Sequence, residues 1–281
     1  MARCGKRYEW ASVVIGAAGL VIGLGPAGCG DKERAASGAD SASGGAMTEA
    51  PVDPRWQQSF AEATLADPPA GVGLPPETTM TGKSVGKLYT KVVRLWDGIR
   101  FVSPGGKRLA YQATLDTEMG TIDIALLPDL APNHVRSFIA LARAGYYDGL
   151  VFERTIHEES GNTQLEQIEA GCPLGTGEIG QGGIGYWLKP EKNSHATHEE
   201  GTVGAGHGPE TDAGTCKFYI NLCKTPSLDG EYTVFGKVTQ GLDVARRILS
   251  LPLSNEAPEG DRPAKPVVIR KVTIKASEVE N

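Results

Sequence analysis

Short runs that alternate apolar and polar residues, separated by glycine-containing turns, constrain the fold of this chain more than any other feature. The first two, in "LAYQATLDTEMGTIDIALL" from Leu109, are joined by such a turn, as expected for a hairpin. Further runs follow at 150–155, 217–223 and 266–274, and a second hairpin is predicted at 227–238. Many short strands have many exposed edges, which closure of the sheet removes. The pattern predicts a mainly β fold, built as a closed antiparallel barrel.

Helical patterns are few. Residues 131–145 predict a helix, with Pro132 in its first turn, Gly145 at its end, and one apolar face made of Val135, Phe138, Ile139 and Ala142. A second helix is predicted at 241–251. Before the barrel, residues 84–99 predict a third helix that Ser84 can cap. Its apolar stripe indicates that it packs on the main domain; the stripe comprises Val85, Leu88, Tyr89, Val92, Leu95, Trp96 and Ile99.

The first 29 residues have the order of an export signal. Arg3, Lys6 and Arg7 precede the uncharged run "ASVVIGAAGLVIGLG", and small residues then lead to Cys29. The run is shorter than the ~20 residues of a spanning helix. The "AGC" ending is similar to a bacterial lipoprotein cleavage box, which predicts lipidation of Cys29; the alternative is an uncleaved N-terminal anchor. Either way we expect an exported protein, held at a membrane of the cell envelope and facing the periplasm or the exterior.

Residues 30–54 are small and polar, and they predict a flexible linker. The chain carries a formal net charge of −6 without a basic block, which argues against nucleic-acid binding.

After Cys29, three cysteines remain: Cys172, Cys216 and Cys223. A disulfide between Cys172 and Cys216 is one reading of these residues, and buried thiols are the other.

Three histidines, His195, His198 and His207, lie within thirteen residues. Histidines three residues apart can share a metal ion, but this stretch resembles a loop and offers no clear fourth ligand. We therefore predict no metal and no cofactor. A metal hydrolase would require these histidines to bind zinc.

Longer motifs carry a resemblance to a known family. The stretches "GTIDIALLPDLAPNHVRSFIALARAGYYDGLVFERTI", "GTVGAGHG", "KFYINL" and "SLDGEYTVFGKVTQGLDVARRI" resemble the cyclophilin-type peptidyl-prolyl cis-trans isomerases over residues 109–276. The resemblance implies an eight-stranded antiparallel barrel capped by two helices, preceded here by a helical extension at 55–108. It also implies an isomerase that acts on proline-containing chains without a cofactor. We expect a monomer.

The resemblance assigns catalysis to Arg154, which follows Phe152 by two residues as the family's arginine follows a phenylalanine. Rotation about an amide has a barrier near ~20 kcal/mol. Twisting leaves a lone pair on the prolyl nitrogen, and a fixed donor aimed at it stabilises the twisted state. Strand alternation places Leu150, Phe152 and Arg154 on one face. The alternative role for Arg154 is an ion pair with Glu153, Glu158 or Glu159.

The peptide-binding positions that the resemblance implies depart in part from the family. Glu166 and Gln167 stand where the family has Phe-Met, and Glu169 and Lys217 stand at two glutamine positions. Glu169 can pair with Lys217 or with Arg154. These polar changes favour an alternative function, a noncatalytic peptide-binding or scaffold module. The expected binding residues are Phe152, Gln167, Glu169, Ala205, Gly206, His207, Lys217, Phe218, Tyr219, Leu228 and Tyr232.

Overall fold

The computed structural model describes residues 53–160, 163–177, 183–207, 213–254 and 261–279. The predicted export segment, its Cys29 and linker residues 30–52 lie outside these ranges. No helix in the described ranges is long and apolar enough to cross a bilayer.

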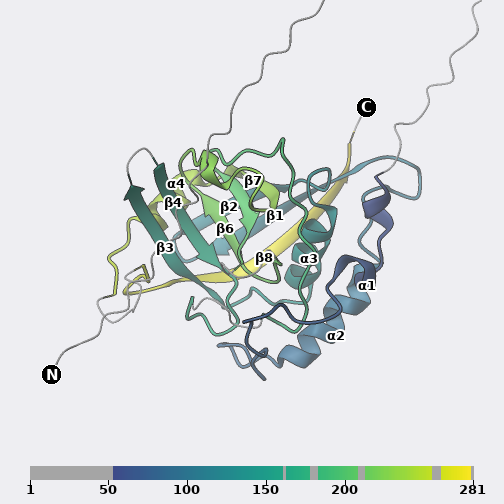
Figure 1. The fold of residues 1–281 in the computed structure, drawn as a ribbon, viewed down its shortest axis with the longest axis horizontal. Helices are drawn as coiled ribbons and strands as arrows, with labels where there is room; N and C mark the ends of the chain where they lie inside the picture. Colours follow the sequence, from purple (N-terminus) through teal and green to yellow (C-terminus); the bar gives the residue numbers. More distant parts are fainter. Residues whose placement is uncertain (1–52, 161–162, 178–182, 208–212, 255–260, 280–281) are drawn as a thin grey trace, which may run out of the picture. The chain divides into compact units, whose positions relative to one another are not determined.

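Eight strands close into an antiparallel barrel, as predicted (Figure 1). Around the barrel the strands follow the order β1-β2-β7-β5-β6-β4-β3-β8. Their bounds are β1 Leu109–Thr117, β2 Gly120–Leu126, β3 Val151–Ser160, β4 Thr163–Ala170, β5 Thr202–Ala205, β6 Phe218–Asn221, β7 Val234–Gln240 and β8 Val267–Glu278.

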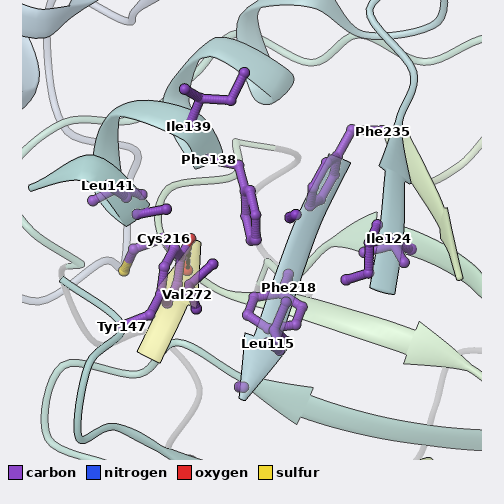
Figure 2. Close-up of a cluster of buried hydrophobic side chains, with 14 of the residues drawn as sticks. Leu115, Ile124, Phe138, Ile139, Leu141, Tyr147, Cys216, Phe218, Phe235 and Val272 are labelled. Carbon is purple, nitrogen blue, oxygen red and sulfur yellow. Dashed lines mark hydrogen bonds between the residues drawn. The ribbon is translucent and has the colours of Figure 1, made fainter. Parts of the chain in front are cut away.

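The core lies inside the barrel and under helix α3 (Pro132–Arg143). Figure 2 shows Phe138 of α3 above Phe218 and beside Phe235, with Leu115 and Ile124 of the first hairpin nearby. Phe138 packs edge-on against Phe218, with 5.5 Å between the ring centroids. Helix α4 (Leu242–Leu249) packs against β2, β3 and β4. The two predicted helices therefore cover the barrel at separate places.

The residues before the barrel form a layer that packs against α3. They comprise 3-10 helix η1 (Pro54–Gln57), α1 (Phe60–Ala63) and α2 (Val85–Trp96), and α2 lies beside α3 in Figure 1. The helix predicted at 84–99 is confirmed over the range of α2. Ser84 stands at its N-cap position but makes no side-chain capping hydrogen bond.

This layer changes the environment of α3. The sequence predicts one apolar face, yet 11 of the helix's 12 residues are buried. Arg136, 2% exposed, donates hydrogen bonds to the carbonyl oxygens of Trp56, Gln58 and Ile99. The extension therefore satisfies polar groups on the face of α3 that points away from the barrel.

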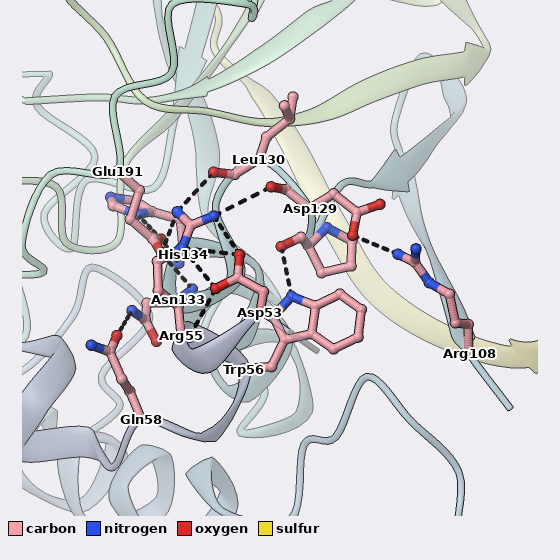
Figure 3. A network of polar contacts seen from close by, with 11 residues as sticks. Asp53, Arg55, Trp56, Gln58, Arg108, Asp129, Leu130, Asn133, His134 and Glu191 are labelled. Carbon is pink, nitrogen blue, oxygen red and sulfur yellow. Dashed lines mark hydrogen bonds and ion pairs between the residues drawn. The ribbon is translucent and has the colours of Figure 1, made fainter. Parts of the chain in front are cut away.

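A carboxylate holds the first turn of α3. Glu191 accepts hydrogen bonds from the backbone nitrogens of Asn133 (3.2 Å) and His134 (2.9 Å), and Arg55 of η1 lies 3.7 Å from the same carboxylate. Figure 3 shows these side chains around the start of the helix. A negative charge at a helix N-terminus is stabilising, so Glu191 does for α3 what a capping side chain does elsewhere.

The hairpin predicted at 227–238 is wrong. Residues Pro226–Leu228 form 3-10 helix η2, and β7 begins only at Val234. Strand β5 pairs with both β6 and β7 and lies between them. The turn residues of this stretch therefore join two strands that are not neighbours.

Candidate functional site

The candidate site lies on the outer face of β3, β4 and β6. Ile168 of β4 and Ile220 of β6 are fully buried in the core, so the residues that alternate with them face outward. Cross-strand pairing places Glu169 opposite Tyr219, and Gln167 opposite Asn221. Polar side chains from distant parts of the chain thus meet on one face.

A β-bulge in β3 positions Arg154. Phe152 pairs with Ala170 and Arg154 with Glu169, so two residues of β3 face one step of β4. The predicted strict alternation through Phe152 and Arg154 is therefore wrong at this point. Phe152 lies in the core, and Glu153 is 0% exposed. The bulge turns Arg154 toward Glu169.

Among the described residues, two carboxylates hold the guanidinium of Arg154. Asp261 Oδ2 lies 2.7 Å from its Nε and 2.5 Å from its Nη2, and Glu169 Oε2 lies 3.2 Å from its Nη1. Lys217 Nζ lies 3.3 Å from the same oxygen of Glu169. Both pairings left open for Glu169 therefore occur together. We call Asp261, Arg154, Glu169 and Lys217 the ion network.

Glu169 and Lys217 favour their charged forms despite burial. Burial raises the pKa of Glu169, but Lys217 and Arg154 outweigh it, and the pKa is lowered overall. Burial lowers the pKa of Lys217, and Glu169 and then Glu153 outweigh that effect, so it is raised overall. Two cations and two anions alternate along the network, which leaves it without net charge.

Within the described residues, the ion pairs of Arg154 run to Glu169 and Asp261 and not to Glu153, Glu158 or Glu159. Glu153 lies buried at the bulge. Burial raises its pKa to about 8, although Lys217 opposes this.

Aromatic side chains continue the site beyond the ion network. Tyr219 is 2% exposed, and its hydroxyl lies 2.7 Å from His198 Nε2. Tyr232 packs edge-on against Tyr219 and stacks on His207 at 4.3 Å. Leu228 ends η2 and is half-buried.

Some of the remaining expected site residues lie in the core, and others make hydrogen bonds near the ion network. Phe152 and Phe218 lie inside the barrel core, so we leave both out of the peptide-binding surface. Ala205 of β5 is also buried, whereas the backbone nitrogen of Gly206 donates to the carbonyl oxygen of Lys217 at 3.0 Å. Gln167 is 5% exposed and donates to Asn221 Oδ1 at 3.3 Å.

Glu166, the neighbour of Gln167, points to different partners. Its carboxylate lies 3.6 Å from His157 Nδ1 and 3.9 Å from Arg246 Nη1 of α4. Of the two residues at the Phe-Met positions, only Gln167 belongs to the face that carries Arg154.

The three clustered histidines lie in different surroundings, and the three cysteines form no disulfide with one another in the part of the chain that the structure describes. His195 is exposed, whereas His198 contacts Asp229 and His207 stacks on Tyr232. In the described ranges no three His, Cys, Asp or Glu side chains gather as metal ligands. Within the same ranges no disulfide joins the cysteines, which are Cys172, Cys216 and Cys223.

Asp261 is one of the site residues that the sequence did not reveal. It lies 107 positions from Arg154, in a stretch without a motif. Its carbonyl oxygen also accepts a hydrogen bond from the backbone nitrogen of Thr155 at 2.8 Å. His198 and Asp229 were missed as well, although the "LDG" turn around Asp229 forms part of the family motif.

Comparison with known proteins agrees with this architecture. Residues 112–274 match the family described as cyclophilin type peptidyl-prolyl cis-trans isomerase/CLD. Peptidyl-prolyl cis-trans isomerase-like 1 of Neurospora crassa is 35% identical over 59% of this chain and 95% of its own length. Peptidyl-prolyl cis-trans isomerase-like 2 of Cryptococcus neoformans is 36% identical over 60% of this chain, but the match spans only 28% of that protein.

A solved structure shares the fold. It is a Cryptosporidium parvum cyclophilin type peptidyl-prolyl cis-trans isomerase, studied in the presence of the dipeptide Ala-Pro. It aligns with a TM-score of 0.50 and 22% identity over 58% of this chain and 98% of its own. The barrel, the two helices and the matched motifs agree, and the chain belongs to the cyclophilin-type peptidyl-prolyl cis-trans isomerase family.

Proposed function

We propose that the protein is a peptidyl-prolyl cis-trans isomerase that acts on proline-containing protein chains. The observation that carries the proposal is the fixed guanidinium of Arg154, held between Asp261 and Glu169 on the outer face of the barrel. The reaction needs no nucleophile, because only rotation about the X-Pro bond occurs. It needs a donor that is stronger toward the twisted amide than toward either planar form.

Arg154 supplies such a donor. In the planar amide the prolyl nitrogen shares its lone pair with the carbonyl group, and in the twisted amide the lone pair is localised. An N–H of Arg154 directed at this nitrogen lowers the energy of the twisted state alone. Because Asp261 and Glu169 already orient the guanidinium, little reorganisation is needed at the moment of reaction.

Lys217 preserves the field of Arg154. Two carboxylates against one guanidinium would leave a net negative charge, which would oppose donation to the prolyl nitrogen. Lys217 Nζ lies 3.3 Å from Glu169 and offsets that carboxylate. The pair Glu169–Lys217 thus replaces two neutral glutamines of the family pattern without adding net charge.

The proline ring needs an apolar surface beside Arg154. We assign this surface to Tyr219, Leu228 and Tyr232, which lie on or next to β6 and η2. The presence of Ala-Pro with the Cryptosporidium relative supports a prolyl peptide as ligand.

We further propose that the protein works in the cell envelope, as a monomer, attached to a membrane through its N-terminus. The support is the sequence before residue 30, with its basic start, uncharged run and Cys29. Globomycin inhibits lipoprotein signal peptidase, and accumulation of an unprocessed precursor in treated cells would support lipidation. A mature N-terminus other than Cys29 in untreated cells would contradict it.

A prolyl isomerisation assay with a peptide containing Ala-Pro tests the enzymatic proposal. We expect Arg154→Ala to lower kcat/KM about a hundredfold, the scale for removing one preorganised donor. Arg94→Ala, at an exposed position of α2, is the matched control and should behave as wild type.

The competing function is a noncatalytic peptide-binding module. Two observations favour it: carboxylates on both sides of Arg154 weaken its field, and Gln167 adds a polar group to the binding face. If wild type and Arg154→Ala both leave the spontaneous rate unchanged, while wild type still binds the peptide, the module is the correct function.

A further inference from the structure

The hydroxyl of Tyr219 ends a chain of three hydrogen-bonded side chains. Asp229 Oδ1 lies 2.9 Å from His198 Nδ1, and His198 Nε2 lies 2.7 Å from the hydroxyl of Tyr219. A carboxylate only accepts hydrogen bonds, so we assign the hydrogen of His198 to Nδ1; Nε2 then accepts from the hydroxyl of Tyr219. We call these three side chains the tyrosine relay.

His198 suits the centre of this relay because it is buried and neutral. The residue is 1% exposed, and burial lowers its pKa even though Asp229 acts in the opposite direction. A charged imidazole would donate from both nitrogens and compete with the hydrogen of the tyrosine hydroxyl. The neutral ring gives the relay a single direction.

His198 also joins three segments of the chain through its backbone. Its carbonyl oxygen accepts from the backbone nitrogen of Thr225 at 2.8 Å and from Asn221 Nδ2 at 3.3 Å. Its backbone nitrogen donates to Asp229 Oδ1 at 2.6 Å. The segment before β5, strand β6 and the turn that carries Leu228 are therefore tied together at one residue.

The ring of Tyr219 occupies space that only a glycine leaves open. Gly204 of β5 pairs directly with Tyr219, and a Cβ at Gly204 would lie 2.2 Å from both Cζ and the hydroxyl oxygen of the tyrosine. Tyr232 packs edge-on against the same ring, with 6.0 Å between centroids. The ring thus lies directly over the backbone of Gly204, and His198 binds its hydroxyl group.

We propose that His198 is a positioning residue for peptide binding: through the tyrosine relay it fixes the ring of Tyr219, and through Asp229 it fixes the turn that carries Leu228, in one arrangement for the proline ring. The inference rests on the proposed isomerase function. Because the hydrogen bonds of the relay do not include Arg154, the relay acts on substrate binding, and Arg154 acts on the twisted amide.

Steady-state kinetics with the Ala-Pro peptide test the relay. We expect His198→Gln to raise KM about fivefold, the scale of one lost hydrogen bond, and to leave kcat within about twofold. Tyr219→Phe keeps the ring and removes the same hydrogen bond, so the double variant should be no worse than His198→Gln alone. His195→Gln, an exposed histidine three positions earlier, is the matched control.

Several results would overturn the relay. The first is an unchanged KM in both single variants, and the second is a loss confined to kcat. The third is a double variant whose KM rises by the product of the two single increases, as expected for independent residues. If His198→Gln does not fold, as judged by its thermal unfolding, Tyr219→Phe decides the question alone.

If wild type does not isomerise the peptide, the proposed function fails separately. The relay is then judged by titrating the same peptide into wild type and Tyr219→Phe. Weaker binding to the variant supports the relay, whereas an equal Kd, or no binding to wild type, overturns it.

Discussion

Glu153 lies fully buried at the bulge before Arg154, and its carboxyl makes the stability of the barrel depend on pH. Its Oε1 accepts a hydrogen bond from the backbone nitrogen of Cys172 at 2.9 Å, whereas Oε2 has no partner in the described part of the chain. Burial is the main reason that its pKa rises from 4.5 to about 8. At neutral pH the folded protein therefore holds a proton that the unfolded chain releases.

The sign and size of the effect follow from linkage. A carboxyl that binds its proton more tightly in the folded state stabilises the fold below pH 4.5 and loses that contribution as pH rises toward 8. Each pH unit in this window costs about 1.4 kcal/mol, so the whole loss is about 5 kcal/mol. Glu153→Gln mimics the protonated carboxyl and abolishes this loss.

Urea unfolding of wild type and Glu153→Gln from pH 5 to pH 8 measures the effect. We expect the two free energies of unfolding to be nearly equal at pH 5 and the variant to be more stable by about 3 kcal/mol at pH 7. The other titrating groups contribute equally to both proteins, so their contributions cancel in the difference between the two free energies of unfolding. Glu159→Gln, at an exposed position of β3, should show no such trend. A difference that does not change with pH would refute the reasoning.

Three further substitutions follow from contacts described above. Glu169→Gln removes the charge 3.2 Å from Arg154 but keeps an oxygen acceptor. We expect isomerisation to become about fivefold faster, which corresponds to an activation free energy lower by about 1 kcal/mol. An unchanged rate would contradict this expectation. Gly204→Ala places a methyl group 2.2 Å from the Tyr219 ring, so KM should rise in the isomerisation assay. Gly86→Ala meets nothing within 4 Å and is its control; equal KM values would count against the close approach. Arg136→Met removes the donor to the carbonyl oxygens of Trp56 and Ile99 and one of two donors to that of Gln58, and should lower the free energy of unfolding by about 3–5 kcal/mol, as chemical denaturation would report.

The Arg136 substitution has a matched control on the same helix. Arg143 is exposed at the end of α3, and Arg143→Met should change stability by less than about 0.5 kcal/mol. Equal losses in the two variants would mean that the contacts with the extension contribute nothing specific.

Features set by neighbouring residues could be predicted from the sequence. The first hairpin and the helix that begins at Pro132 follow from local periodicity and turn residues. The pairing of Glu169 with Lys217 was foreseeable because both replace glutamines of one family site.

Features set by tertiary contact could not be predicted in the same way. Asp261 reaches Arg154 across 107 positions without a motif that points to it. A bulge inserts one residue without a side-chain signature, so alternation misplaced the face of Phe152 relative to Arg154. Phe218 alternates with Tyr219, and only the observed pairing decides which ring faces the core.

The docking of the extension on α3 separates two meanings of the word domain. The part of this chain that matches the family begins at residue 112, yet Arg136 within that part finds its acceptors at Trp56, Gln58 and Ile99. The family match therefore defines a smaller unit than the hydrogen bonds of Arg136 do. A barrel transplanted without its leading layer would expose Arg136 and the neighbouring face of α3 to water, and would lose the acceptors that the layer provides. For this chain, the part that matches the family is smaller than the part that we expect to fold as one unit.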